Sequence, residues 1–198
     1  MKIYGDTKSG NCYKVQLVCN LLNIDHQWID VDILAGDTKS DDFLSKNPNG
    51  KIPLLELDNG ETLSESNAII NYLASGSDLY PDGGLAQARV LQWQFFEQYS
   101  HEPFIAVARF INKYLGLPTD KADEYAAKRA GGHKALRVME QQLAQTPFLT
   151  GENATTADIS LYAYTHVADE GGFELEAYPA VRAWLDRIAA LPSFKPMA

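Results

Sequence analysis

The sequence has only two cysteines, Cys12 and Cys19, among its 198 residues. On one helix these thiols would be separated by about 10 Å of rise, which is too far for a disulfide. The four histidines are scattered, and none falls in a cluster with the spacing of a metal site. We therefore expect free thiols in a reducing compartment and no bound metal.

Positive charge is also scarce. Seventeen lysines and arginines face 26 acidic residues, giving a formal net charge of -9 and a pI near 4.8. A nucleic-acid partner would require a basic face, so none is expected. No apolar run is long enough to span a membrane, and Met1–Gly5 enters a strand without a secretory signal. These absences predict a cytoplasmic protein with no membrane partner.

What is present suits a globular protein, with 45% hydrophobic and 22% charged residues. The first half predicts alternating short strands and helices. A strand–helix–strand start predicts a parallel pair with a right-handed crossover. The dipeptide Asn59-Gly60 predicts a two-residue hairpin between antiparallel strands. In order, the predicted elements are a strand at Lys2–Gly5, a helix carrying Val15, Val18, Cys19 and Leu22 on one face, a strand at Gln27–Ile33, a helix at Asp41–Ser45, strands at Leu54–Leu57 and Glu61–Leu63, and a helix capped by Ser64.

After a turn-rich stretch at residues 75–84, the strand signals disappear. Helices are predicted over residues 86–114, with a bend or break at Pro103, and over residues 121–145, weakened by Gly131-Gly132. Thr155–Asp158 matches a capping box before a buried helix at residues 159–167, and Val181 to Leu191 marks a last helix. We predict an α/β domain at residues 1–77, a linker at 78–84 and an all-helical domain at 85–198.

The stretch around Pro53 organises the first domain. A proline opening a strand is tolerated at the first position, or where its peptide bond is cis. A cis Ile52–Pro53 bond would turn the N–H and C=O of Ile52 outward, where an extended peptide could pair with them. The N–H groups of Glu65 and Ser66, at a helix N-terminus, form an anion site. The stretch therefore offers a peptide-backbone dock beside a carboxylate pocket.

The Ile52-Pro53 pair followed by Glu65-Ser66-Asn67-Ala68-Ile69 resembles the glutathione-binding signature of the glutathione S-transferases. Residues 148–151 and 155–158 resemble the capping motif of that family's helical domain. The resemblance, to bacterial serine- or cysteine-type members that are theta-, beta- or nu-like, covers the whole chain. It implies a thioredoxin-like α/β N-terminal domain, an all-α C-terminal domain, glutathione as co-substrate without a metal, and a homodimer.

The resemblance also implies a residue that activates the thiol. Ser9 matches the first-loop serine of theta- and zeta-like members and would donate to the thiolate, with Asn11 as a second donor. Lowering a thiol pKa by about 2 units requires about 2.7 kcal/mol of preference for the charged form. The alternative is that Ser9 and Asn11 merely turn the chain and cap the helix. Cys12, three residues beyond the family position, is expected to pack.

For glutathione, the resemblance implies that Glu65 accepts from the α-ammonium group and that Ser66 donates to the γ-glutamyl carboxylate. The alternative for this pair is an ordinary helix cap. The backbone of Ile52 would pair with the cysteinyl unit. Lys51 could bind the glycyl carboxylate or be a solvated charge. The predicted binding residues are Lys39, Lys51, Ile52, Pro53, Glu65 and Ser66.

The second substrate is expected between the domains, against the helix at residues 86–114. Tyr99, Phe104 and Arg109 are the candidates, ahead of Phe96, His101 and Ala108. The alternative is that this aromatic stripe belongs to the core.

The sequence therefore predicts a glutathione transferase that conjugates a small electrophile, as in detoxification. One alternative is a glutathione-dependent disulfide reductase or peroxidase on the same fold, which Ser9 and Asn11 leave open. The other is a non-catalytic binding or scaffold protein, against which the intact Ile-Pro, Glu-Ser and first-loop hydroxyl count.

Overall fold

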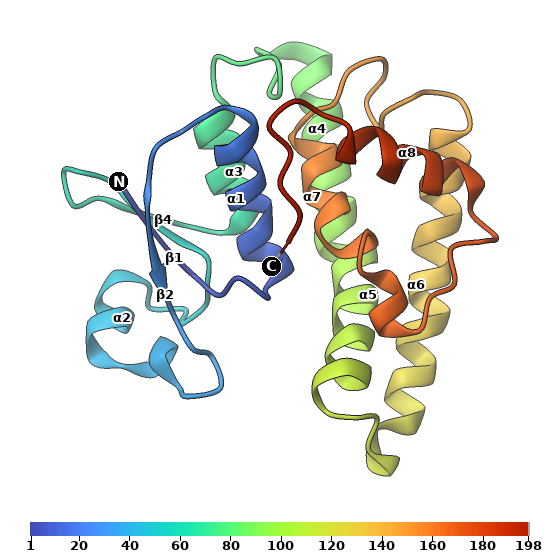
Figure 1. Cartoon of the computed structure of the whole chain (residues 1–198), viewed down its shortest axis with the longest axis horizontal. Coiled ribbons are helices and arrows are strands. Elements are labelled where there is room, and N and C mark those ends of the chain that lie inside the picture. Colours follow the sequence, from blue (N-terminus) through green and yellow to red (C-terminus); the bar gives the residue numbers. More distant parts are fainter. Residues whose placement is uncertain (198) are drawn as a thin grey trace. The chain divides into compact units, whose positions relative to one another are not determined.

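A computed structural model describes residues 1–197, and the chain divides into two compact units. The first comprises Met1–Ser77 together with the chain from Leu191 onward, and the second comprises Asp78–Ala190. In the first unit, helices α1 and α3 lie side by side (Figure 1). Its elements are β1 (Lys2–Gly5), α1 (Gly10–Leu21), β2 (Gln27–Asp30), the short 3-10 helix η1 (Asp37–Lys39), α2 (Asp41–Lys46), β3 (Leu54–Glu56), β4 (Thr62–Ser64) and α3 (Ser66–Ala74).

The four strands form one sheet in the order β2-β1-β3-β4. The predicted parallel pairing of β1 with β2 and antiparallel pairing of β3 with β4 are confirmed. β1 also pairs antiparallel with β3, placing Tyr4 opposite Leu54. Side chains from the sheet and from α1 and α3 are fully buried, among them Ile3, Leu54, Leu55, Val15, Val18, Ile69 and Ile70. The unit is the predicted thioredoxin-like fold, which presents the first turns of α1 and α3 together.

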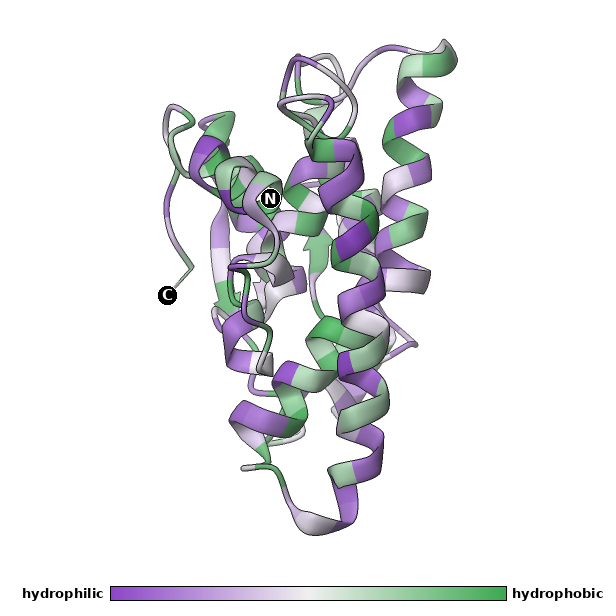
Figure 2. Cartoon of the chain, turned by 90° about the vertical axis from the view of Figure 1, so that its right-hand side faces the viewer, coloured by the Kyte–Doolittle hydropathy of each residue, from purple (hydrophilic) through white to green (hydrophobic). Residues whose placement is uncertain are grey.

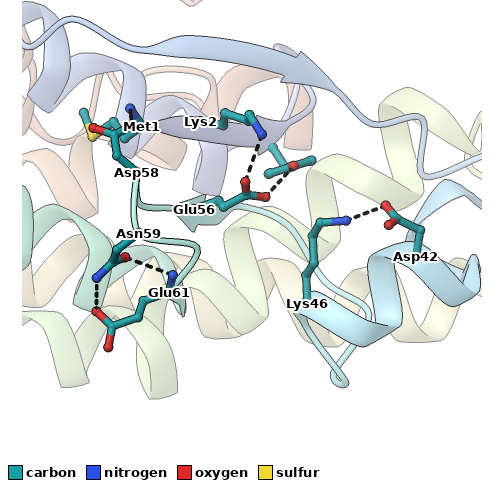
Figure 3. Close-up of polar contacts among 9 residues, drawn as sticks. Met1, Lys2, Asp42, Lys46, Glu56, Asp58, Asn59 and Glu61 are labelled. Atoms are coloured by element: carbon teal, nitrogen blue, oxygen red, sulfur yellow. Dashed lines mark hydrogen bonds and ion pairs between the residues drawn. The ribbon is translucent and has the colours of Figure 1, made fainter.

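Polar contacts along the sheet reinforce the pairing of β1 with β3 (Figure 3). Lys2 Nζ lies 2.9 Å from one oxygen of Glu56, and the hydroxyl of Tyr4 donates to the other at 2.7 Å. These two bonds, that of Tyr4 first, lower the pKa of Glu56. Burial, followed by the bond to Glu56, raises the pKa of Tyr4 to about 12. Tyr4 is therefore engaged within the sheet.

Two local predictions in this unit are wrong. The hairpin loop runs over residues 57–61 rather than two residues, because Leu57 N–H donates to the carbonyl of Glu61 (2.8 Å) and Gly60 N–H to that of Leu57 (2.9 Å). Gly60 takes a φ of 85°, which closes this longer turn. Ser64 ends β4 rather than capping α3, and Glu65 occupies the N-cap.

The second unit is helical, as predicted. It contains α4 (Gly84–Phe96), the π-helical turn η2 (Glu97–His101), α5 (Glu102–Arg109), a second π-helical turn η3 (Phe110–Tyr114), the 3-10 turn η4 (Thr119–Lys121), α6 (Ala122–Leu143), α7 (Thr156–Thr165), the 3-10 turn η5 (Ala168–Gly171) and α8 (Pro179–Ala189). Residues 84–114 are helical without interruption, so the expected break at Pro103 is absent. Pro103 falls in the first turn of α5, directly after a π-helical turn, where a missing N–H is tolerated.

Glycines in the middle of α6 allow close packing. A Cβ on Gly132 would lie 2.4 Å from the ring of Phe173, and one on Gly131 would lie 2.0 Å from that of Phe104. All ten residues of α7 are buried, which confirms the predicted central helix. The capping box of Thr155 and Asp158 is also confirmed.

Within residues 1–197, no helix is both long and apolar enough to cross a membrane. Hydrophobic and hydrophilic residues instead alternate along the helices (Figure 2).

The C-terminal segment is attached to the first unit, where the hydroxyl of Tyr13 in α1 donates to the carbonyl of Lys195 at 2.8 Å.

Candidate active site

Ser9 is the N-cap of α1 and has an extended backbone conformation. Its Oγ accepts a long hydrogen bond of 3.5 Å from Cys12 N–H, beyond the usual 2.7–3.2 Å. Capping, the alternative interpretation, is therefore present in the structure. A serine hydroxyl has two acceptor lone pairs and one donor proton, so accepting this bond does not use its proton. Ser9 can cap α1 and still donate to a sulfur.

The neighbouring thiol is placed differently. Cys12 is fully buried, and burial raises its pKa to about 11. A Cβ on Gly5 of β1 would lie 3.0 Å from its sulfur, so the thiol packs directly against the sheet. Cys19 is also buried, and both cysteines are free. The expectation that Cys12 packs is confirmed.

Ile52 and Pro53 precede the sheet, whose ladder begins at Leu54. Their peptide bond is cis. The side chain of Ile52 packs against the core cluster of Val31, Phe43 and Leu54, and Pro53 is buried. Ile52 stays partly exposed, and its main chain lies directly before the buried Pro53 and the start of β3.

The turn into α3 holds a residue in an unusual conformation. Glu65 has φ 70° and ψ 112°, a region that costs a non-glycine residue roughly 1–3 kcal/mol. Such strained residues cluster at ligand clamps. The side chain of Glu65 is exposed, whereas the next residue, Ser66, is only 6% exposed. The helix start thus offers a carboxylate at the surface and backbone amides for an anion.

Three side chains connect the starts of α1 and α3. Ser66 Oγ donates to Asn11 Oδ1 at 3.2 Å and accepts from Lys14 Nζ at 3.3 Å. The contact brings Asn11 and Ser66, two residues predicted separately, into one network. Lys14 is completely buried, with 0% of its surface exposed. It was not singled out from the sequence. The available signal was that Lys14 is the only charged residue in α1.

The two predicted lysines gather just before Ile52. Lys39 Nζ donates to the carbonyl of Gly50 at 3.4 Å, and a Cβ on Gly50 would come within 2.7 Å of that nitrogen. Lys51 follows directly and is exposed. Two cationic side chains, Lys39 and Lys51, therefore lie at the start of the stretch that runs from Gly50 to the Glu65–Ser66 turn.

The residues predicted for a second substrate lie in the second unit, each in its own surroundings. Tyr99, on η2, is 80% exposed. Phe104 packs at Gly131 with Lys128 Nζ 5.5 Å from its ring. Arg109 is buried and pairs with Glu170 at 2.5 Å, which gives it a structural partner. Over residues 1–197, no group of three or more histidine, cysteine or acidic side chains could hold a metal ion.

Comparison with known families matches both units. Residues 9–75 match the model of the glutathione S-transferase N-terminal domain, and residues 122–187 match that of the glutathione S-transferase C-terminal domain. Glutathione S-transferase 3 of Zea mays is 35% identical over 98% of this chain and 91% of its own length. Disulfide-bond oxidoreductase YfcG of Escherichia coli is 30% identical over 92% of this chain and 87% of its own.

Solved structures give the same result. The crystal structure of a glutathione S-transferase from Pseudomonas fluorescens superposes with a TM-score of 0.98 at 58% identity, covering 99% of this chain and 98% of that one. The glutathione transferase URE2P6 of Phanerochaete chrysosporium, solved in complex with oxidized glutathione, superposes with a TM-score of 0.87 at 28% identity, covering 97% of this chain and 91% of that one.

Proposed function

Because the chain belongs to the glutathione S-transferase family, we propose that it binds glutathione in its first unit and conjugates it to a small electrophile. The observation that carries the proposal is the hydrogen bond from Ser66 to Asn11. It joins the anion-binding start of α3 to the loop that holds Ser9. One continuous site can thus take both the acidic tail and the sulfur of the same tripeptide.

The binding mode follows from the chemistry of each group. The exposed carboxylate of Glu65 would accept from the α-ammonium group of glutathione, and the amides at the start of α3 would donate to the neighbouring carboxylate. The backbone of Ile52 would pair with the cysteinyl unit. Lys39 and Lys51 would attract the glycyl carboxylate.

Thiol activation would come from Ser9 and Asn11. Each donor that reaches the sulfur favours the thiolate over the thiol, and the N-terminus of α1 adds a favourable electrostatic potential. A hydrogen bond to a charged group is worth about 1.5–3 kcal/mol, so two donors can supply the roughly 2.7 kcal/mol that a shift of about 2 units requires.

The first experiment measures binding of glutathione by titration calorimetry. Glu65→Ala should weaken binding about tenfold or more, the equivalent of one lost charged hydrogen bond. Ser66→Ala breaks the bond to Asn11 that joins the two helix starts, and should weaken binding as well. The surface changes Glu176→Ala and Ser45→Ala are the matched controls and should bind as the native chain does. If the native chain binds no glutathione, the non-catalytic alternative is favoured.

The second experiment tests the catalytic group. Ser9→Ala should lower the kcat/KM of conjugation by about tenfold to a hundredfold, because one donor to the thiolate is lost. Retention of full activity in this variant would mean that Ser9 only caps α1.

A disulfide reductase on the same fold is the second candidate, favoured by the place of Asn11 in the site and by the similarity to the E. coli oxidoreductase. There the glutathione thiolate would attack a mixed disulfide instead of a carbon electrophile. Rates with a chlorinated nitroaromatic and with a mixed disulfide, measured on the same preparation, decide between the two reactions.

We further propose a cytoplasmic homodimer. Leu85 and Phe95 of α4 are 67% and 62% exposed, which is unusual for large apolar side chains. Between α4 and α6 an open groove of about 330 Å³ is lined in part by Trp93, Phe96 and Val138. Light scattering on the purified protein should give twice the mass of 21.9 kDa. Phe95→Asp should reduce it to that of one chain.

A further inference from the structure

Lys14 is the residue of the site that has no role in the function proposed above. Its side chain is completely buried, and its Nζ lies 3.3 Å from Ser66 Oγ. It occupies the second turn of α1, after the N-cap Ser9 and after Asn11 in the first turn. A lysine is almost never fully buried unless it is paired, so the partners of Lys14 matter to the fold of this site.

The chemistry of these side chains fixes the direction of their hydrogen bonds. A lysine ammonium has three donors and no acceptor, so the bond to Ser66 requires Ser66 Oγ to accept. Beside the bond that it accepts, the Ser66 hydroxyl donates its single proton to Asn11 Oδ1 at 3.2 Å. That neighbour must accept in turn, so Asn11 presents its carbonyl oxygen to Ser66. The amide nitrogen Nδ2 of Asn11, which is the donor, therefore points away from Ser66.

We infer that Lys14 is a positioning residue: its ammonium fixes the direction of the Ser66–Asn11 hydrogen bond, so that Asn11 offers an N–H donor, and not an oxygen, to the sulfur of bound glutathione. The inference rests on the proposed glutathione-binding function. Without Lys14, the Ser66 hydroxyl could rotate and the amide of Asn11 could turn over, placing a carbonyl oxygen beside the thiolate. That arrangement would disfavour the charged sulfur.

The test is the pKa of the bound glutathione thiol, followed by the ultraviolet absorbance of the thiolate against pH at saturating glutathione. Lys14→Met keeps the length and burial of the side chain but removes its donors. We expect it to raise the bound thiol pKa by about one unit, the equivalent of one lost hydrogen bond to a charged sulfur. Lys14→Arg, which is also a donor without an acceptor, should keep the native value. Lys8→Met changes an exposed lysine in the loop before α1 and is the matched control for a general effect of charge.

Ser66→Ala provides a second route to the same result, because it cuts the network while leaving Lys14 in place. It should raise the bound thiol pKa to a similar extent, and the double variant should raise it no further. This comparison decides the question even if Lys14→Met does not fold.

The outcomes separate the two proposals. If the native chain binds glutathione and Lys14→Met or Ser66→Ala keeps the native thiol pKa, the role of Lys14 is overturned and the proposed function stands. An equal rise in Lys8→Met would also overturn it, because any nearby charge would then suffice. If the native chain binds no glutathione, both proposals are overturned together.

Discussion

The two cysteine side chains show how burial decides reactivity at single residues. Burial raises the pKa of Cys12 to about 11 and that of Cys19 to about 12, so both remain neutral thiols between pH 7 and pH 9. We predict that an aromatic disulfide reagent labels neither thiol rapidly in the native chain and labels both after unfolding. Cys12→Ala should keep glutathione-dependent activity. Rapid labelling of one native thiol would contradict this.

Pattern alone selected most of the candidate site residues. Ser9, Asn11 and Ser66 stand at helix starts, where polar side chains and free amides are expected from the sequence. Lys14 was missed because a lysine on a predicted helix is ordinarily solvated. In the structure, α1 is buried on nearly all sides, and only the tertiary packing shows that its single charge lies inside.

At the scale of elements, the pairing of β1 with β3 depends on the ionisation of Glu56. Its lowered pKa means that its bonds to Tyr4 and Lys2 stabilise the fold fully above the unfolded value of about 4.3. That contribution to stability is lost as the pH falls through the lowered pKa that Glu56 has in the folded protein. Glu56→Gln should therefore cost about 1 kcal/mol of unfolding free energy at pH 7 and progressively less below about pH 4.

Denaturant titration across this pH range measures the effect. Glu124→Gln removes an equally charged carboxylate, which pairs with Lys121 at an exposed site, and should change stability little. A cost for Glu56→Gln that did not depend on pH would assign the effect to packing.

The start of α7 depends on one carboxylate. Asp158 accepts hydrogen bonds from Leu149 N–H, Thr155 N–H and Trp184 Nε1, each at 2.9 Å. Burial raises the pKa of Asp158, while these bonds act in the opposite direction. Asp158→Ala should cost about 3 kcal/mol or more, because it leaves buried donors unpaired.

Asp158→Asn keeps the shape and one acceptor oxygen, so thermal unfolding should show a smaller loss than for Asp158→Ala. Equal losses in the two variants would mean that the charge, and not the number of accepted bonds, holds this helix start.

Elements could be predicted where one sequence signal dominated, as in the capping box at Thr155 and the parallel pair of β1 and β2. They could not be predicted where two sequence signals favoured different local structures. The loop around Asn59-Gly60 is set by side-chain bonds between Asn59 and Glu61, which favour a longer turn. The effect of Pro103 could not be predicted because a π-helical turn absorbs it, and the sequence carries no periodicity for such a turn.

On the scale of the whole molecule, the end of the chain belongs to the unit in which the chain begins. Tyr13 is 1% exposed, and its hydroxyl holds that segment by donating to the carbonyl of Lys195. Tyr13→Phe should lower the unfolding free energy by about 1 kcal/mol, the loss of one hydrogen bond, and increase protease cleavage after residue 190. Tyr72→Phe, which changes an exposed tyrosine of the same unit, is the matched control.

This attachment also sets an order of events during synthesis. The residues that would bind glutathione emerge from the ribosome early, yet the last piece of their own unit is translated only after the entire helical half. A ribosome adds about 5–20 residues per second, so the segment from Leu191 onward is synthesised several seconds or more after the first 77 residues, with which it packs. In a nascent chain that lacks the residues from Leu191 onward, the first unit should therefore be incompletely folded and should not retain glutathione. If an arrested chain of that length did retain glutathione, the terminal segment would not be needed for binding.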